Sequence, residues 1–424
     1  MKEFDGKKLL ILGGITTECD IVRAAQKMGV YVIVADSDPN APARNIADEF
    51  VQISATDVDE IVKYCKSNKI DGITTGFVDI LMSPCYEACK QLELPTYFTP
   101  KMLKMATDKI DFKKTCEKYG VPVPKTYLVG NALTNDVLSE INYPVFVKPL
   151  DASGSRGAGV CNNQTELENQ FVEALSYSVS GNAIIEDYIT GTEFLLDYVG
   201  VNGEFRLLSM FDRYMSSDRG SAINYSNVSL CPAKYIDQYY NEINSKVIEM
   251  FQKLNFKDGL IFLQGHTDGK KITFYEMGSR LGGSFYNLEE KILGLNPVEM
   301  IVRCALTGKM LPSIDNINNR SAVFKKTGIV ANYLLKDGDG IISSISGIEK
   351  VKQMPEFVSF SQRRFEGESF KKDRTVDKPV LCFYMASEGI DKAKLTIKKM
   401  NELIEVKDID GSSLLSMKYE PSNL

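Results

Sequence analysis

The sequence has few of the residues that form metal cages or redox pairs. It contains one histidine, His266, and its nine cysteines include no pair at CxxC spacing. Neither a zinc cage nor a disulfide framework is therefore expected, and the cysteines are predicted to be buried, reduced thiols. No Ser-His or Cys-His constellation is recognisable, because His266 stands beside a predicted turn without a partner motif and is expected at the surface.

Long apolar runs and an excess of basic residues are also absent. The first apolar run, LLILGG, is too short for the core of a signal sequence and for the roughly 20 residues that span a bilayer. The formal net charge of -6 leaves no basic excess to bind a phosphodiester backbone. We therefore expect a cytoplasmic protein that binds neither a membrane nor nucleic acid.

The length predicts more than one domain. A chain of 424 residues is too long for one compact core, and two to three domains of about 100 to 200 residues are expected. In residues 1–98, four apolar runs (KKLLIL, VYVIVADSD, FVQIS and DGITTGF) alternate with helical patterns, which predicts a doubly wound parallel sheet. No GxGxxG follows the first run, so a dinucleotide-binding fingerprint is not indicated.

Residues 99–310 are predicted to form a larger central domain. Thr99 can cap a helix that begins at Pro100 and ends before Gly120, and Asn202-Gly203 predicts a two-residue hairpin turn. A helix over about 235–254, a hairpin over 259–277 and two helices between 284 and 309 are expected next. Residues 311–424 show short strands, turns and one helix near 391–404, as in a small α+β domain.

The most informative feature is a lysine at the end of a predicted strand, followed by a glycine-rich loop. In PVFVKP, Val145 and Val147 alternate with Lys148, so the strand buries the valines and turns Lys148 toward the other face. The loop SGSRGAG follows, and its glycines allow backbone amides to close on phosphate oxygens. A nucleoside triphosphate site is the functional interpretation, and a solvated surface hairpin is the alternative.

The order of five motifs resembles the ATP-grasp superfamily, especially stand-alone ligases related to carbamoyl-phosphate synthetase and phosphoribosylglycinamide synthetase. The motifs are TDK with Lys109, PVFVKP with Lys148, the loop from Ser153 to Gly159, IIEDYITGTE, and FYEMGSRLGG with Glu276 and Arg280. The resemblance covers nearly the whole chain. It implies an N-terminal doubly wound parallel sheet (1–98), a central ATP-grasp domain (99–310) with a lid at about 145–190, and a small C-terminal α+β domain (311–424).

The resemblance also implies a nucleotide-binding role for each matching residue. Lys109 and Lys148 look like the lysines that hold the α- and β-phosphates, with the glycine loop as a cover. Glu186 would accept from the adenine amino group and Glu193 from a ribose hydroxyl, although a charged strand edge is the alternative for both. The implied ATP-binding residues are Lys109, Lys148, Ser153, Gly154, Ser155, Gly157, Gly159, Glu186, Tyr188, Ile189 and Glu193, where Tyr188 and Ile189 act through their backbone.

The metal site departs from the family pattern. Many relatives carry two carboxylates twelve residues apart and an asparagine two residues after the second, but the corresponding residues here are Gln264, Glu276 and Gly278. Mg²⁺ (or Mn²⁺) often takes only one or two carboxylates together with phosphates and water. Glu276 is therefore expected to suffice, with Gln264 supplying a neutral oxygen or none, and the number of ions stays open.

The hairpin between these two residues tests that interpretation. Side chains alternate along a strand, so a two-residue turn at Asp268-Gly269 would point Gln264 away from Glu276. A three-residue loop, 268–270, would bring both side chains to one face. We therefore predict an odd-numbered loop.

Arg280 resembles the arginine that binds the transferred phosphoryl group or the acyl-phosphate, because a guanidinium offers an oxyanion a bidentate fork. The resemblance implies an ADP-forming carboxylate-amine (or carboxylate-thiol) ligase with an acyl-phosphate intermediate. Its substrates would be a small-molecule carboxylate and an amine, and a homodimer is a superfamily-level expectation.

Two other functions stay open, and so do the identities of the substrates. One is a purine-pathway enzyme like phosphoribosylglycinamide synthetase, and the other is a nucleotide-binding protein whose catalysis has decayed, as Gln264 and Gly278 suggest. No general base is apparent. Arg213, Tyr214 and Arg219 are candidates to line a site for an anionic acceptor, with a solvated charged loop as the alternative.

Overall fold

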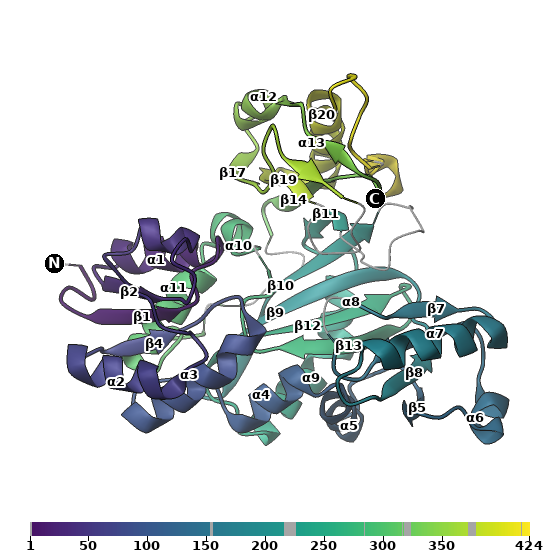
Figure 1. Cartoon of the computed structure of the whole chain (residues 1–424), viewed down its shortest axis with the longest axis horizontal. Helices are drawn as coiled ribbons and strands as arrows, with labels where there is room; N and C mark the ends of the chain where they lie inside the picture. The colour runs from purple at the N-terminus through teal and green to yellow at the C-terminus, as the bar shows by residue number, and fades with distance from the viewer. Residues whose placement is uncertain are drawn as a thin grey trace.

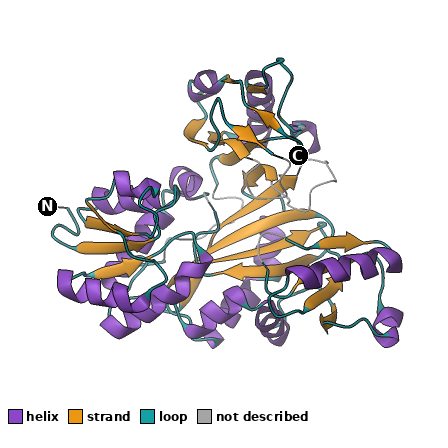
Figure 2. Ribbon diagram, in the orientation of Figure 1, coloured by secondary structure: helices purple, strands orange, loops and turns teal. Residues whose placement is uncertain are grey.

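The structure, a computed structural model, describes residues 2–152, 156–215, 226–283, 285–315, 317, 324–371, 379–416 and 418–424. These residues form one parallel and one antiparallel four-stranded sheet, an eight-stranded sheet and two short strand pairs. Figure 1 shows the elements from the N-terminus on the left, a smaller lobe with α7 on the right, and the C-terminal elements at the top. Figure 2 shows that helices cover the sheets of the two lower lobes.

The N-terminal lobe contains the parallel sheet, in the order β3-β2-β1-β4. Residues Leu9–Leu12 of its inner strand are fully buried, as expected for a parallel strand covered on both faces. The helices α2 and α3 pack together, and α1 packs against α11, a helix from far along the chain (Figure 1). The predicted doubly wound sheet is confirmed. Its elements are β1 (Lys8–Leu12), α1 (Glu18–Lys27), β2 (Tyr31–Ala35), the 3₁₀ turn η1 (Pro42–Asn45), β3 (Glu49–Val51), α2 (Val58–Asn68), β4 (Gly72–Thr74), α3 (Asp79–Leu92) and α11 (Pro297–Thr307).

Two helices, α4 (Pro100–Thr107) and α5 (Lys109–Lys118), stand where the sequence predicted one. Thr99 caps α4 as expected, with its hydroxyl 3.1 Å from the backbone nitrogen three residues later. The chain then turns at Asp108, whose carboxylate accepts the backbone N–H groups two and three residues later and so caps a second helix. The prediction of a single helix was wrong, and Lys109 is the first residue of α5.

The small antiparallel sheet has the order β5-β8-β6-β7. Val145 and Val147 of β6 are fully buried in a cluster with the apolar face of α7, whereas Lys148 alternates to the other face. The predicted orientation of this strand is confirmed. The elements are β5 (Thr126–Gly130), α6 (Asn135–Glu140), β6 (Val145–Pro149), β7 (Gly159–Cys161), α7 (Gln164–Tyr177) and β8 (Ala183–Asp187).

The large sheet has the order β13-β12-β9-β10-β11-β14-β19-β17. Asn202 and Gly203 both have positive φ (54° and 87°), which confirms the two-residue hairpin between β9 and β10. The predicted helix over 235–254 is two helices, α8 and α9. The elements are β9 (Thr192–Val201), β10 (Glu204–Met215), β11 (Ser226–Cys231), α8 (Ile236–Glu242), α9 (Asn244–Lys253), β12 (Gly259–Thr267), β13 (Ile272–Gly278), α10 (Tyr286–Leu293), β14 (Thr327–Leu334), β17 (Phe357–Gln362) and β19 (Pro379–Ser387).

The large sheet includes β14, β19 and β17, so it continues beyond residue 310, the predicted domain boundary. The other C-terminal elements pack on these strands, and the domain limits stay predictions. The remaining elements are β15 (Gly340–Ile341), β16 (Ser344–Ser346), α12 (Ile348–Lys352), β18 (Ser369–Phe370), α13 (Gly389–Leu403), β20 (Glu405–Lys407) and η3 (Pro421–Asn423). All nine cysteines are buried and unpaired, as predicted. In the described part of the chain, no helix combines the length and apolarity needed to cross a bilayer.

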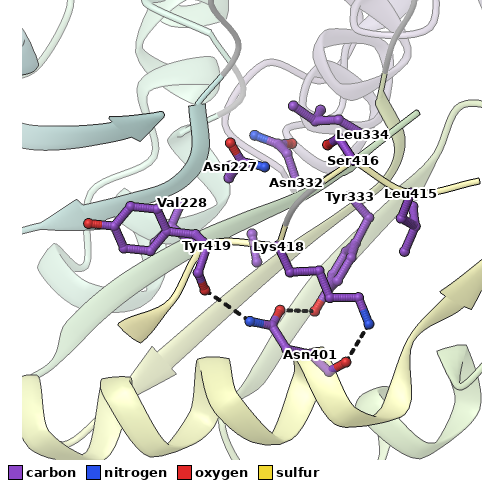
Figure 3. A pocket seen from close by; sticks show the side chains of 11 residues that line it. Asn227, Val228, Asn332, Tyr333, Leu334, Asn401, Leu415, Ser416, Lys418 and Tyr419 are labelled. Atoms are coloured by element: carbon purple, nitrogen blue, oxygen red, sulfur yellow. Dashed lines mark hydrogen bonds between the residues drawn. The ribbon is translucent and has the colours of Figure 1, made fainter. Parts of the chain in front are cut away.

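A small cavity lies between β14, α13 and the C-terminal tail (Figure 3). Its volume of about 10 Å³ is enough for about one water molecule, and the buried hydroxyl of Ser416, which lacks a hydrogen-bond partner, lines it. Lys418 and Tyr333 already bond to Asn401 at its edge. This cavity is therefore too small for a ligand, and the functional site must lie elsewhere.

Candidate functional site

A buried ion-pair cluster lies where α5 meets the small antiparallel sheet. Glu186, in β8, is only 2% exposed. Lys148 Nζ lies 2.6 Å from its Oε1, and Lys113 of α5 donates to its Oε2. Lys113 also donates to the hydroxyl of Thr126 at 3.0 Å. Because one carboxylate serves two ammonium groups, positive charge is left over inside the protein.

Lys109 brings a third ammonium group to the same place. Its Nζ lies 3.1 Å and 2.8 Å from the carbonyl oxygens of Leu150 and Ala152, just after Lys148. Burial, and then the charge of Lys148, lower the pKa of Lys109. The lysines of two separate motifs therefore converge. We call Lys109, Lys113, Lys148 and Glu186 the lysine cluster.

The pKa values in the lysine cluster reflect its excess of cations. Burial works to raise the pKa of Glu186, but Lys148 and Lys113 outweigh it and hold the pKa below its ordinary value. Burial lowers the pKa of Lys113 despite its partner. The cluster thus stabilises the ionised form of Glu186 and disfavours the charged forms of Lys109 and Lys113, as expected where cations outnumber anions.

The segment that follows β8, which we call the hinge, borders a second, larger cavity. Both oxygens of Glu186 already accept from lysines, so its predicted bond to an adenine amino group is untested and would have to share an occupied acceptor. The backbone N–H of Tyr188 donates to the carbonyl of Pro144 at 3.3 Å. A cavity of about 190 Å³ lies beside the hinge, lined by Pro124, Pro144, Asp187, Tyr188, Ile189, Thr190, Asp268, Lys271 and Thr273.

The glycine loop is described in part, because Ser153, Gly154 and Ser155 lie outside the described residues. At Gly157 an added Cβ would lie 2.6 Å from the ring of Tyr177, and at Gly159 it would lie 2.4 Å from the side-chain oxygen of Gln170. Both neighbours belong to α7. Packing against this helix therefore already favours glycine at Gly157, where φ is also positive at 67°, independently of phosphate. At Gly159 the neighbour is the end of a flexible side chain, which could move aside.

Glu193 lies at the start of β9 in a buried polar group. Its Oε1 accepts from Tyr275 at 2.7 Å and from Arg213. Arg213, a candidate for an acceptor site, is thus bound to Glu193, while Tyr214 donates to Asp212 and Arg219 lies outside the described residues. His266 is half-buried beside Tyr275, with ring centroids 5.6 Å apart, so it keeps part of its expected exposure.

Gln264 and Glu276 are direct cross-strand partners, which places both side chains on one face of the sheet. The loop does not do this, because it has four residues: Thr267 pairs with Ile272. The predicted odd-numbered loop was therefore wrong. A β-bulge at Tyr275 inserts one extra residue and restores the shared face. Directly opposed residues have Cβ atoms about 5 Å apart, within reach of one cation.

This pair fits one Mg²⁺ ion. Both side chains offer oxygen ligands, and neither has a hydrogen-bond partner in the described part of the chain. Burial raises the pKa of Glu276 although its carboxylate still reaches solvent, whereas the charges of Arg280 and Lys148 act to lower it. Glu276 therefore lies within the electrostatic field of the lysine cluster and Arg280. No group of three or more His, Cys, Asp or Glu side chains around a metal position occurs among the described residues.

Gly278 cannot supply a third ligand, and the structure gives the reason. A Cβ at Gly278 would lie 2.1 Å from Cε1 of Phe262. The ring thus fills the space where a relative's asparagine would begin. The same ring lies under Arg280, whose guanidinium carbon is 4.9 Å from the ring centroid.

Arg280 lies just after β13 and is bound to the N-terminal lobe. Its Nε and Nη2 donate to the two oxygens of Asp79 at 2.6 Å and 2.9 Å, and Nη1 donates to the carbonyl of Leu281 at 2.8 Å. Sequence reasoning missed Asp79, for which no local signal exists. It also left Lys113 out of the site, although its position one helical turn after Lys109 could have indicated a shared face.

Comparisons with known proteins find matches over most of the chain. Residues 108–314 match the family described as "Carbamoyl-phosphate synthase L chain, ATP binding domain", and residues 9–83 match "PylC-like, N-terminal domain". The formate-dependent phosphoribosylglycinamide formyltransferase of Sulfurisphaera tokodaii is 30% identical over 374 residues, covering 83% of this chain and 87% of the relative.

Two solved structures share the fold over most of the chain. The L-amino acid ligase from Bacillus licheniformis has a TM-score of 0.77 at 18% identity and covers 95% of this chain and 98% of its own. The biotin carboxylase domain of 2-oxoglutarate carboxylase from Hydrogenobacter thermophilus, solved with MgADP, has a TM-score of 0.75 at 18% identity, with 95% and 91% covered. At such identities the likeness establishes the fold alone.

Proposed function

Because this chain belongs to the ATP-grasp superfamily of ligases, we propose that it joins a carboxylate to an amine through an acyl-phosphate. It is an enzyme whose cofactors are ATP and Mg²⁺. In the proposed reaction the substrate carboxylate attacks the γ-phosphorus of ATP and releases ADP. The neutral amine then attacks the acyl carbon and expels phosphate, so a C–N bond replaces the C–O bond.

The lysine cluster is the observation that carries this proposal. Two ammonium groups share one carboxylate in a largely buried setting, and a third, that of Lys109, binds only backbone carbonyl oxygens. Burial lowers the pKa of Lys109 and Lys113. A polyphosphate supplies the missing negative charge. In this proposal Lys109 and Lys148 bind the α- and β-phosphates, and Lys113 holds Glu186 so that Lys148 is kept in place.

The other ATP-binding residues keep the roles that the superfamily implies. Ile189 offers its backbone N–H to the adenine edge and Glu193 accepts from the ribose, while the loop from Ser153 to Gly159 covers the phosphates. Closing this cover removes water, which strengthens every charge interaction beneath it.

Glu276 and Gln264 would hold one Mg²⁺ or Mn²⁺ ion, which would supply charge neutralisation at the transferred phosphoryl group. The local packing supports a single ion: with Phe262 in the space next to Gly278, this hairpin supplies one carboxylate and one amide oxygen.

Arg280 binds the transferred phosphoryl group. A preorganised donor to such developing charge contributes about 3 to 4 kcal/mol in comparable sites, and alignment of the reactants supplies about 7 to 11 kcal/mol more. The protein therefore needs no nucleophile of its own.

The test is ADP release on mixing the enzyme with ATP, Mg²⁺ and pools of L-amino acids, chosen because the amino acid ligase of similar fold makes them the first class to try. Stimulation of ADP release, lost in Arg280→Ala, supports the ligase. Tight nucleotide binding without any stimulated turnover would instead indicate a nucleotide-binding protein whose catalysis has decayed.

A second candidate is a phosphoribosylglycinamide synthetase-like purine enzyme. The 30% identity to a formyltransferase that acts on phosphoribosylglycinamide favours it. Two mixtures test it: glycine with phosphoribosylamine, and formate with phosphoribosylglycinamide. If ADP release requires phosphoribosylamine or phosphoribosylglycinamide, the proposed function becomes that of this purine enzyme.

The place of action and the assembly are part of the same proposal. Nine buried, unpaired cysteines fit a reducing compartment, and we propose the cytoplasm. We also propose a homodimer, which light scattering on the purified protein tests directly.

A further inference from the structure

Arg280 and Asp79 form a bidentate ion pair between residues 201 positions apart. Arg280 follows β13, whereas Asp79 is the first residue of α3 in the N-terminal lobe. The arginine side chain is 18% exposed and the aspartate 54% exposed. The pair therefore lies at the edge of the site, where one lobe meets the other.

The backbone around Arg280 is also held by the N-terminal lobe. The hydroxyl of Tyr97 donates to the carbonyl of Ser279 at 3.1 Å, and the backbone N–H of Leu281 donates to the carbonyl of Gly76 at 3.2 Å. Leu281 is buried in the apolar cluster that contains the strands of the parallel sheet. The position of the Arg280 backbone thus does not depend on Asp79, and the ion pair acts on the side chain.

The five N–H donors of a guanidinium have fixed directions, so those already used can be counted. Asp79 takes Nε and one donor of Nη2, which form the side edge of the group. The carbonyl of Leu281 takes one donor of Nη1. One donor remains on each terminal nitrogen. An incoming oxyanion can bind to these remaining donors, and the Phe262 ring lies against the guanidinium group, 4.9 Å from its central carbon to the ring centroid.

We propose that Asp79 is a positioning residue, which holds Arg280 by its side edge and so directs the two remaining donors toward the reacting oxyanion. This inference rests on the proposed role of Arg280 in phosphoryl transfer.

The chain offers a closely matched control. Arg303 and Glu3 form a second bidentate pair between α11 and the N-terminal segment, with side chains 22% and 47% exposed. This pair joins α11 to the N-terminal segment within the N-terminal lobe, away from the lysine cluster (Figure 1). Asp79→Asn, Asp79→Glu, Glu3→Gln and Arg280→Ala can therefore be compared in the full-length protein.

The first measurement is the binding of inorganic phosphate to the enzyme with MgADP, by titration calorimetry. We expect Asp79→Asn to weaken phosphate binding about tenfold or more, because misplacing a reacting group by about 1 Å can cost up to a hundredfold. ADP affinity and melting temperature should match those of Glu3→Gln, and Asp79→Glu should restore part of the loss. Removing a negative charge would by itself tighten anion binding, so the sign separates positioning from simple charge.

The outcomes separate the two proposals. Unchanged or tighter phosphate binding in Asp79→Asn, with binding lost in Arg280→Ala, would overturn the role of Asp79 alone. Failure of the wild-type MgADP complex to bind phosphate, or binding that Arg280→Ala retains, would overturn the role of Arg280 and with it this inference. In turnover, Asp79→Asn should lower kcat with no change in the KM for ATP.

Discussion

The two halves of the site handle charge differently. In the lysine cluster, three ammonium groups face one carboxylate, and Glu186 and Lys113 are almost fully buried. In the other half, Arg280 is matched by one aspartate that is more than half exposed. The lysine cluster therefore carries excess positive charge, whereas the charges of Arg280 and Asp79 balance each other.

This difference separates binding from orientation. An anion that binds next to buried, unpaired positive charge gains a large electrostatic free energy. The lysine cluster should therefore determine the affinity for the nucleotide. An anion gains less electrostatic free energy from an arginine that is already paired with an aspartate. Arg280 should therefore contribute little to nucleotide affinity and act mainly in the chemical step. The predictions below try to break this division, beginning with the largest expected effect.

Lys148→Ala and Arg280→Ala should both lower turnover by about a hundredfold or more, the usual cost of removing one preorganised donor. Only Lys148→Ala should also weaken the binding of MgADP, because only the lysine contacts the polyphosphate in both the ground and the transition state. Calorimetric titration of each variant with MgADP decides this. Equal loss of nucleotide affinity in both variants would contradict the division.

Lys113→Met should weaken nucleotide binding about tenfold and destabilise the protein by about 1 to 3 kcal/mol, because Glu186 loses one of its two buried partners. Lys114→Met is the matched control, since the next residue is exposed and should change stability by less than about 0.5 kcal/mol. Thermal melting with and without ADP measures both effects. If the two variants behave alike, Lys113 does not support the site.

Gln264→Glu places a second carboxylate directly opposite Glu276. We expect Mn²⁺ to bind the ADP complex about tenfold more tightly, which corresponds to about 1.4 kcal/mol. Titration of Mn²⁺ by electron paramagnetic resonance gives both affinity and stoichiometry. A Gln264→Leu control should weaken binding slightly, and no response to either change would remove Gln264 from the metal site.

The smallest effect on nucleotide affinity is expected at a pair of buried acids, Glu289 and Asp197, next to the segment that follows Arg280. Ser209 lies 2.5 Å from Glu289 and 3.4 Å from Asp197, and burial raises the pKa of Glu289 to about 7 from 4.5. Since the folded state holds this proton more tightly than the unfolded state, stability should fall as pH rises from about 4.5 through 7.

Glu289→Gln should remove the part of this pH dependence that Glu289 contributes, because an amide resembles the protonated acid. Asp197, whose pKa is raised by burial and by the charge of Glu289, keeps a part of its own. The variant should therefore be more stable than the wild type at pH 8, by about 1 to 3 kcal/mol, and similar at pH 5. Melting curves across this range measure the difference. Nucleotide affinity should not change. A large change would mean that these buried acids are energetically coupled to the nucleotide site.

Local patterns in the sequence were enough for much of the fold. The valines of β6 and the positive φ angles at Asn202 and Gly203 follow from strand alternation and turn chemistry, which act over a few residues. The single helix predicted after Thr99 failed because Asp108, an acceptor able to cap a new helix, was not weighed against the helical periodicity. The odd-numbered loop failed because a bulge at Tyr275 supplied the extra residue within the strand instead.

By itself, the sequence determined the parallel sheet near the N-terminus, the order of the nucleotide-binding motifs, and which lysine ends β6. These depend on residues that are neighbours in the chain. Only the tertiary structure decided that α11 covers α1, that Lys113 and Lys148 share Glu186, and that Asp79 holds Arg280. Such pairings join residues tens to hundreds of positions apart, and packing of whole elements, which leaves no local periodicity, brings them together.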